Sequence, residues 1–336
     1  MSSDGLIENA RRIYYVPETI MKSVLRTAWI LIFVGTAMGA AASAAQCDRA
    51  CLDKLVDTYV AAMVAHDPSK VPFASEVKFV ENTMPMRPGE GLWKTASDGP
   101  TTFKIYVPDA VAHQVGFLCV MQEEGKPIQF ALRLKLKNGK ITEAEHLIAR
   151  NLQPNNLKNL QTPRPGLIET VPQAERIPRD KMLKIGYSYY TALVTGNGNA
   201  APFADDCERH ENGMQTTGNP PSNTPGFGTV GAMGCHDQLN THIFDYIARI
   251  EPRRVEIADV EDGLVFGLSQ FRQPMKQNFV KIVGVPGLEK VDMPFKPFDL
   301  PAAHIFKIRG GKIHEIEAMG FMAPYNSKTG WEQSGK

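Results

Sequence analysis

Twelve residues in the second half of the chain, PFADDCERHENG at 202–213, concentrate side chains that can move protons or bind a polar ligand. Carboxylates beside a histidine are typical of acid–base sites, because their pKa values can be tuned toward neutral pH. The same side chains also occur on solvated or ion-paired strands that carry no chemistry. The candidates are Asp206, Glu208, Arg209, His210, Glu211 and Asn212.

If this segment is a β-strand, its side chains alternate between two faces. Arg209 and Glu211 then share one face with Cys207, whereas Glu208 and His210 share the other. Polar side chains on both faces are unusual for a core strand. One face must therefore line a polar cavity or pack against polar neighbours, and the sequence leaves open which one.

The same pattern occurs in the first half of the chain. YVAAMVAHDPSKVPFASEVKFVEN, beginning at Tyr59, aligns without a gap with YYTALVTGNGNAAPFADDCERHEN, beginning at Tyr189. Both copies keep the PFA motif and end in a Glu-Asn pair, at Glu81 and Glu211. LRLKLKNGKITEAEHL and HIFKIRGGKIHEIEAM match in the same way further along each half. This internal similarity predicts a duplicated domain.

Each half has the same expected elements. Apolar residues recur at helical spacing between Leu52 and Met63, which predicts a helix. A strand with the Glu-Asn pair follows, and alternation on both sides of an Asn-Gly turn predicts a hairpin. A helical segment feeding a curled antiparallel sheet is an α+β fold. We predict a first domain at 45–150, a Pro- and Asn-rich linker at 151–178 and a second domain at 179–336.

The N-terminal region has the features of a targeting segment. A basic stretch beginning at Met21 precedes a short apolar run and an Ala-Ser-Ala motif, which is typical of a cleaved secretory signal. We therefore expect an upstream extension at 1–20, a signal peptide at 21–44 and a periplasmic or secreted mature protein without a stable membrane span. An uncleaved N-terminal anchor is the alternative.

Export would favour disulfides among the five cysteines. Cys207 and Cys235 flank one polar loop and are the natural pair. Cys47 and Cys51 are close together at an expected helix start, where a bridge is tight but feasible, and the sequence leaves their state open. Cys119 lies in the apolar run VGFLCVM, which predicts a buried free thiol.

Composition and motifs narrow the classes of partner. The chain has 37 basic and 36 acidic residues, so it lacks the basic surplus typical of a nucleic-acid binder. It has no CxxC motif or compact histidine cluster, so we expect no metal. It has no dinucleotide fingerprint, so we expect no redox cofactor. The expected partner is a small-molecule ligand or substrate.

The order of these motifs resembles a known superfamily. A helix with YxxA, then PFA, an acid-bearing strand and a hairpin ending in GKI are similar to the cone-shaped domain of nuclear transport factor two, ketosteroid isomerase and the SnoaL-like polyketide cyclases. The resemblance implies two tandem cones, each a curved antiparallel sheet with N-terminal helices, packed together as a pseudo-dimer. It implies a monomeric pseudo-dimer or a homodimer in solution.

The resemblance also implies roles for particular residues. The family's spacing from PFA to the catalytic carboxylate of ketosteroid isomerase leads to Glu81 and Glu211. The family's oxyanion-holding tyrosine lies close to the positions of Tyr59 and Tyr189. The position of its second oxyanion donor, a protonated aspartate, holds alanine in both halves. A steroid-type dienol isomerase is therefore disfavoured.

We predict that chemistry resides in the second domain, as that of a cofactor-independent isomerase, dehydratase or lyase. A carboxylate or histidine would take a proton from a small, partly apolar substrate. The predicted catalytic residues are Glu211, His210, Arg209 and Tyr189, and the predicted substrate-binding residues are Asn212, His304, Glu81, Tyr59 and Trp93. Three alternatives stay open: a structural Glu-Asn pair, a Trp93 that packs instead of closing a cavity mouth, and a non-catalytic ligand-binding or interaction module.

Overall fold

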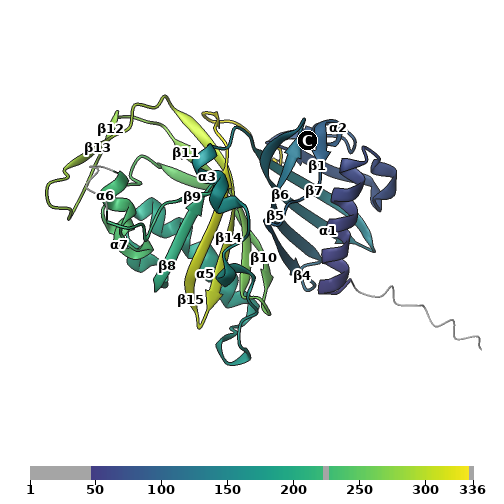
Figure 1. The fold of residues 1–336 in the computed structure, drawn as a ribbon, viewed down its shortest axis with the longest axis horizontal. Helices are drawn as coiled ribbons and strands as arrows, with labels where there is room; N and C mark the ends of the chain where they lie inside the picture. Colours follow the sequence, from purple (N-terminus) through teal and green to yellow (C-terminus); the bar gives the residue numbers. More distant parts are fainter. Residues whose placement is uncertain (1–46, 222–226, 333–336) are drawn as a thin grey trace, which may run out of the picture. The chain divides into compact units, whose positions relative to one another are not determined.

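The computed structural model describes residues 47–221 and 227–332. The expected upstream extension at 1–20 and signal peptide at 21–44 lie outside the described residues. Within the described ranges, no helix has the length and apolar character needed to cross a membrane. The described strands form two seven-stranded sheets, here called sheets A and B, and one two-stranded ribbon (Figure 1).

Sheet A belongs to the first half of the chain. Its strands follow the order β2-β1-β7-β6-β5-β3, with β4 paired to β5. β1 and β7 run parallel, and the other neighbours run antiparallel. The elements are α1 (Arg49–Val64), η2 (Pro68–Lys70), β1 (Phe73–Glu81), β2 (Met84–Met86), α2 (Leu92–Thr95), β3 (Ala96–Asp98), β4 (Lys104–Asp109), β5 (Gln114–Glu123), β6 (Lys126–Lys137) and β7 (Lys140–Ala149).

Sheet B repeats this plan in the second half. Its order is β10-β11-β14-β15-β8-β9, with β16 paired to β14 and with β8 and β15 parallel. The elements are α5 (Arg179–Thr195), η5 (Gly198–Ala200), β8 (Phe203–Glu211), β9 (Met214–Gln215), α6 (Phe227–Gly231), α7 (Cys235–Asn240), β10 (Arg249–Asp259), β11 (Leu264–Gln273), β12 (Phe279–Lys281), β13 (Lys290–Asp292), β14 (Phe298–Arg309), β15 (Lys312–Gly320) and β16 (Ala323–Pro324). The predicted α+β class and the two curved sheets are confirmed.

Local sequence explains where these elements begin and turn. The Asp48 side chain caps α1 by accepting a hydrogen bond from the backbone N–H of Cys51. The β6–β7 turn places Asn138 and Gly139 at φ of 52° and 69°, the left-handed region that this residue pair tolerates. Gly310 and Gly311 take the same conformation between β14 and β15. The predicted hairpins therefore form at their predicted turns.

The cysteines pair as predicted, and the structure also shows the state of Cys47 and Cys51, which the sequence left open. Cys207 and Cys235 form a disulfide, and Cys119 is a buried free thiol. Cys47 and Cys51 are also bridged, with their Cα atoms 5.2 Å apart at the start of α1. Two bridges among the described residues are compatible with an oxidising, extracytoplasmic environment.

The segment predicted as a linker has structure of its own. It contains α3 (Pro154–Leu157), η3 (Lys158–Leu160), α4 (Pro165–Ile168) and η4 (Gln173–Glu175). Leu160, Leu167 and Val171 are buried. The Asn159 amide donates to the Gly213 carbonyl at 2.9 Å, and Arg164 forms an ion pair with Glu315 at 3.2 Å. This segment therefore packs on the second half of the chain.

Each sheet contributes to two apolar cores. On β5, Val115 and Phe117 face α1, whereas the alternating neighbours Leu118 and Val120 join a cluster that includes residues of sheet B. A methyl group at Gly116 would lie 2.4 Å from Phe266 Cγ, so the two sheets approach closely there. The helix-covered face of each sheet is thus left to form the interior of its own cone.

Candidate functional site

The second cone contains a cavity of about 400 Å³ between α5 and the concave face of sheet B. Its walls are mainly aromatic and aliphatic, with a few polar groups, as is usual for small-molecule sites. The lining residues are Arg150, Asn151, Leu152, Gln153, Asn156, Tyr189, Leu193, Glu211, Asn212, Met214, Phe244, Tyr246, Ile247, Phe271, Gln273, Leu300, Ala302, His304, Ala318, Met319 and Gly320.

The two faces of β8 have different environments. Arg209 is 1% exposed and forms an ion pair with Glu211, with Nε and Oε1 3.1 Å apart. Glu211 lines the cavity with a side chain that is 40% exposed. On the other face, His210 Nε2 lies 2.6 Å from Glu208 Oε1, and Glu208 also pairs with Arg164. The cone interior therefore receives Arg209 and Glu211, whereas Glu208 and His210 face the α3–α4 segment.

Arg209 is held by hydrogen bonds and a ring contact on one side of β8. Its Nε donates to Thr216 Oγ1 at 2.9 Å, and its NH2 group donates to the Gln238 side-chain oxygen. The guanidinium lies 4.8 Å from the centroid of the Phe244 ring. Burial opposes the charge, but Tyr189 and Glu211 nearby raise the pKa of Arg209 above its ordinary value, so it stays charged.

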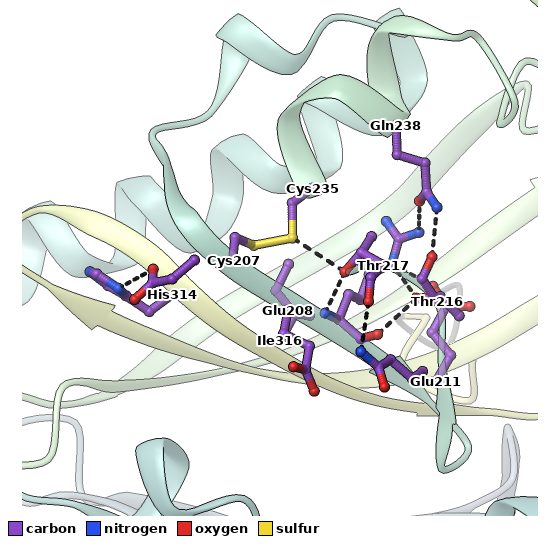
Figure 2. The surroundings of a disulfide bond; sticks show 12 residues. Cys207, Glu208, Glu211, Thr216, Thr217, Cys235, Gln238, His314 and Ile316 are labelled. Atoms are coloured by element: carbon purple, nitrogen blue, oxygen red, sulfur yellow. Dashed lines mark hydrogen bonds and ion pairs between the residues drawn. A yellow bond between two sulfur atoms is a disulfide. The ribbon is translucent and has the colours of Figure 1, made fainter. Parts of the chain in front are cut away.

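The Cys207–Cys235 disulfide stabilises the contacts that hold Arg209. Thr217 Oγ1 accepts a hydrogen bond from the Arg209 backbone N–H at 2.8 Å and lies 3.7 Å from Cys235 Sγ. Figure 2 shows Cys207, on β8, bridged to Cys235 beside Thr217 and Gln238. The disulfide thus ties the start of α7, which carries Gln238, to the strand that carries Arg209.

Tyr189 and His304 are buried, uncharged groups on the cavity wall. Burial raises the pKa of Tyr189 to about 12, although Arg209 opposes the rise. Burial and the nearby Arg209 charge lower the pKa of His304 to about 3. The His304 ring stacks on Phe306 and on Phe271, and its buried Nδ1 has no hydrogen-bond partner in the part of the chain that the structure describes. A neutral imidazole is therefore free to bond to a ligand.

Strand register places Glu211 and His304 on either side of a small residue. Glu211 pairs with Ala318, and Ala318 pairs with His304 on the next strand. Neighbouring strands are about 4.8 Å apart, so the two functional residues originate about 10 Å apart with only a methyl group between them. All three line the cavity. The carboxylate and the imidazole therefore flank an open space instead of bonding to each other.

In the first cone, the residues at the equivalent positions leave no open space, because they bond to one another. Glu81 pairs with His146, and His146 pairs with Leu132. His146 Nδ1 lies 3.0 Å from Glu81 Oε2, and the Tyr59 hydroxyl lies 2.8 Å from His146 Nε2. Glu81 also accepts the backbone N–H of Leu92 at 3.0 Å. These buried groups therefore bond to one another, so the carboxylate and the imidazole of the first cone already have partners.

Aromatic packing fills the rest of that interior. Trp93 is 1% exposed, and its ring meets Tyr59 edge-on at a centroid distance of 5.1 Å. Phe73 contacts both rings. Trp93 therefore packs in the core, as the alternative to a cavity lid predicted.

The structure brings together some of the predicted site residues and separates others. Glu211, Tyr189, Asn212 and His304 line one cavity, and Arg209 lies directly behind it. Predicted residues outside this cavity are His210, which is on the opposite face of β8, and Glu81, Tyr59 and Trp93, which are in the first cone.

Asn212 has a structural function in addition to its place on the cavity wall. Its side chain accepts from the Gly320 backbone N–H at 2.9 Å and donates to the Gly320 carbonyl at 3.0 Å. Asn82 bonds to Ile148 in the same two-way fashion. The asparagine of the repeated Glu-Asn pair is therefore a fold signal, which accounts for its presence in both halves.

Sequence reasoning missed Phe244, Tyr246, Phe271 and Gln273 on the cavity wall. Phe271 and Gln273 alternate at the end of β11, and this spacing was the only available signal. Phe244 and Tyr246 follow α7 in a segment without a counterpart in the first half. In the described ranges, no three His, Cys, Asp or Glu side chains converge as metal ligands would.

A family model described as a domain of unknown function, DUF8021, matches residues 175–320. No curated protein matches the chain.

Solved structures match parts of the chain. One is a protein of unknown function with a cystatin-like fold from Methylobium petroleophilum PM1, which is 17% identical over 32% of this chain and 82% of its own, with a TM-score of 0.27. A candidate polyketide cyclase from Xanthomonas campestris is 17% identical over 42% of this chain and 90% of its own, at 0.28. A candidate SnoaL-like polyketide cyclase from Shewanella denitrificans OS-217 is 14% identical over 43% and 92%, at 0.26. Likenesses at this level carry no argument about activity, and the fold class rests on the strand order described above.

Proposed function

We propose that the second cone is the reactive domain of an exported, cofactor-independent enzyme that performs acid–base chemistry on a small, partly apolar molecule. The observation that carries this proposal is the open space above Ala318, with Glu211 on one side and a neutral, unpartnered His304 on the other. The first cone is then a scaffold with a closed interior.

In this mechanism Glu211 takes a proton from carbon, and Arg209 fixes the orientation of the carboxylate. The Tyr189 hydroxyl and the N–H of neutral His304 donate hydrogen bonds to the oxyanion that develops on the substrate. Transfer of the proton to another atom completes an isomerisation, whereas loss of a leaving group completes an elimination. A positioned general base typically contributes a factor of about 10² to 10⁴ in rate.

The solvent exposure and the ion pairing of Glu211 favour a second function. Its side chain is 40% exposed and paired with Arg209, whereas a strong carboxylate base is usually desolvated and unpaired. A non-catalytic module that binds the same class of small molecule in the same cavity accommodates this pairing.

The proposal includes the cellular location and the oligomeric state of the protein. The two disulfides support a periplasmic or secreted location, and the duplicated sheets support a monomeric pseudo-dimer or a homodimer. The domain limits at 45–150 and 179–336 are part of the proposal, with the segment between them docked on the second cone.

Elimination of 5-nitrobenzisoxazole tests the base directly. A carboxylate removes the proton on C3 while the N–O bond breaks, which releases the coloured 2-cyano-4-nitrophenolate without any cofactor. We expect Glu211→Gln to lower kcat/KM for this probe by about 100-fold or more. Glu208→Gln is the matched control, because it makes the same change on the opposite face of β8, and it should retain the wild-type rate.

The outcomes separate the two functions. Equal rates for the wild-type protein and Glu211→Gln would remove Glu211 as a base. If the probe also binds in the cavity, as measured by a rise in melting temperature, the binding module becomes the better account.

A further inference from the structure

Gln273, the last residue of β11, is a buried amide without a partner. Its side chain is on the cavity wall and the residue is 3% exposed. The side-chain oxygen has no hydrogen-bond partner, and the side chain makes no hydrogen bond to any residue in the described ranges. An unsatisfied buried polar group costs about 1 to 3 kcal/mol. A ligand that bonds to this amide would recover that cost.

Strand register puts Gln273 at the opposite end of the cavity from the reactive groups. His304 pairs with Gly267 on β11, and Gln273 lies six residues further along the same strand. At about 3.3 Å per residue, the two backbone positions are at most about 20 Å apart. Phe271 lies between them and stacks on the His304 ring at a centroid distance of 5.7 Å. The cavity thus offers a flat apolar wall with a polar group at each end.

The charges near the cavity favour a neutral group beside Gln273. Arg150 lies on the lining, but its guanidinium makes two hydrogen bonds to Glu123, with NH2 2.7 Å from Oε1. Arg209 is paired with Glu211. Each cation is already paired with a carboxylate, so neither offers a net positive charge to an anionic ligand, although Arg209 NH1 has no hydrogen-bond partner among the described residues. A neutral amide instead matches a group that both donates and accepts.

We propose that Gln273 forms a second polar subsite, and that the ligand is a neutral, elongated aromatic molecule with a hydroxyl or carboxamide at the end remote from the reacting group. This inference rests on the proposed function, because it assigns the ligand class of the same cavity. Gln273 acts as a specificity-determining residue in binding and takes no part in proton transfer.

Three naphthalene probes test the subsite by isothermal titration calorimetry on the folded, oxidised protein. 2-Naphthol has one polar group. 6-Hydroxy-2-naphthamide adds a neutral group at the far end, and 6-hydroxy-2-naphthoate adds an anionic group there. We expect the carboxamide to bind at least tenfold more tightly than 2-naphthol, and the carboxylate to show no such gain.

Gln273→Leu should abolish the gain from the carboxamide while 2-naphthol still binds. Gln129→Leu is the matched control, because Gln129 is also a fully buried amide with both side-chain atoms unpartnered but is not one of the residues that line the cavity. The Gln129→Leu variant should still bind the carboxamide more tightly than 2-naphthol. Gln273→Met provides a second variant of similar length, so that a folding defect in one variant does not decide the result.

Each outcome decides between the proposals. If 2-naphthol binds but the carboxamide brings no gain, or if the gain survives in both Gln273 variants, the subsite is wrong and the proposed function stands. Equal gains for carboxamide and carboxylate would overturn the neutral class. If none of the probes binds, the ligand-binding cavity is wrong, and the subsite is wrong with it.

Discussion

The two cones share the order of six strands but differ in their interiors, and the position of one histidine accounts for much of the difference. In the first cone His146 pairs directly with Glu81 and bonds to Tyr59. In the second cone Ala318 occupies the equivalent place, and His304 lies one strand further along the row. Moving the imidazole by one strand separates it from the carboxylate and opens the space where a ligand can lie.

The comparison shows how a single scaffold can serve stability or binding. Mutually satisfied buried polar groups rigidify a core, whereas unsatisfied ones cost free energy until a ligand bonds to them. The first cone has a closed Tyr59–His146–Glu81 network with Trp93 packed beside it. In the second cone, His304 Nδ1 has no hydrogen-bond partner among the residues that the structure describes. We therefore expect substitutions at equivalent polar positions to affect stability in the first cone and ligand binding in the second.

The largest expected effect comes from exchanging each histidine for leucine. His146→Leu leaves the Tyr59 hydroxyl and one bond of the Glu81 carboxylate unsatisfied in the core, so the free energy of unfolding should fall by about 3 kcal/mol. His304→Leu removes an imidazole that has no hydrogen bond, so the change should stay within about 1 kcal/mol. Urea denaturation at pH 7 measures both values. Similar losses for the two variants would contradict the contrast between the cones.

A second contrast concerns the glutamates at equivalent positions on β7 and β15. Glu145 pairs with Arg254, with Oε2 2.7 Å from NH1, and it also approaches Arg133. Among the described residues, Glu317 pairs only with Arg164, with NH2 3.4 Å from Oε2, and has Glu315 and Glu208 nearby. Burial raises the pKa of Glu317 to about 8, and this is the largest cause of its shift.

The pH dependence of stability follows from this raised pKa. In the unfolded chain the carboxyl ionises near 4.5, so the folded state holds the proton more tightly between 4.5 and 8. The stabilisation that the bound proton contributes is fully present below about pH 4.5 and is lost as the pH rises through 8. Between pH 6.5 and 8 the loss should be about 1.5 kcal/mol, and Glu317→Gln should flatten the curve. Glu256→Gln, at an exposed carboxylate, should keep the wild-type slope, and a steep curve in Glu317→Gln would show that another group is responsible.

The smallest expected effect comes from filling the space between the two functional groups. Ala318→Leu adds three carbons between Glu211 and His304. It should weaken 2-naphthol binding about tenfold, which corresponds to about 1.4 kcal/mol. Ala318→Ser adds little volume and should bind almost as the wild-type protein does. Isothermal titration calorimetry compares the two. Unchanged affinity in Ala318→Leu would place the ligand elsewhere.

Local features of the chain were readily predicted from its sequence. The helix beginning after Asp48 and the turns at Asn138-Gly139 and Gly310-Gly311 depend on neighbouring residues, which the sequence displays directly. The Cys207–Cys235 bridge could also be predicted, because its partners flank one loop.

The site was predicted only in part. Glu211, Tyr189 and His304 were placed in one site by the repeat and its divergence, and they do share a cavity. His210 was grouped with them because it is their neighbour in sequence, but the strand turns it to the opposite face. The unsatisfied amide of Gln273 could not be predicted from the alternation along β11, because it depends on neighbours that meet only in the folded protein.

The sequence by itself determined the duplication, the α+β class and the residues that differ between the halves. Only the tertiary structure decided that Arg209 and Glu211 face the interior, that Trp93 fills the first cone and that Ala318 leaves the second one open. The physical reason is that helices, turns and hairpins depend on local backbone preferences. A cavity instead depends on the combined volume and register of side chains from five or more segments that meet only after folding.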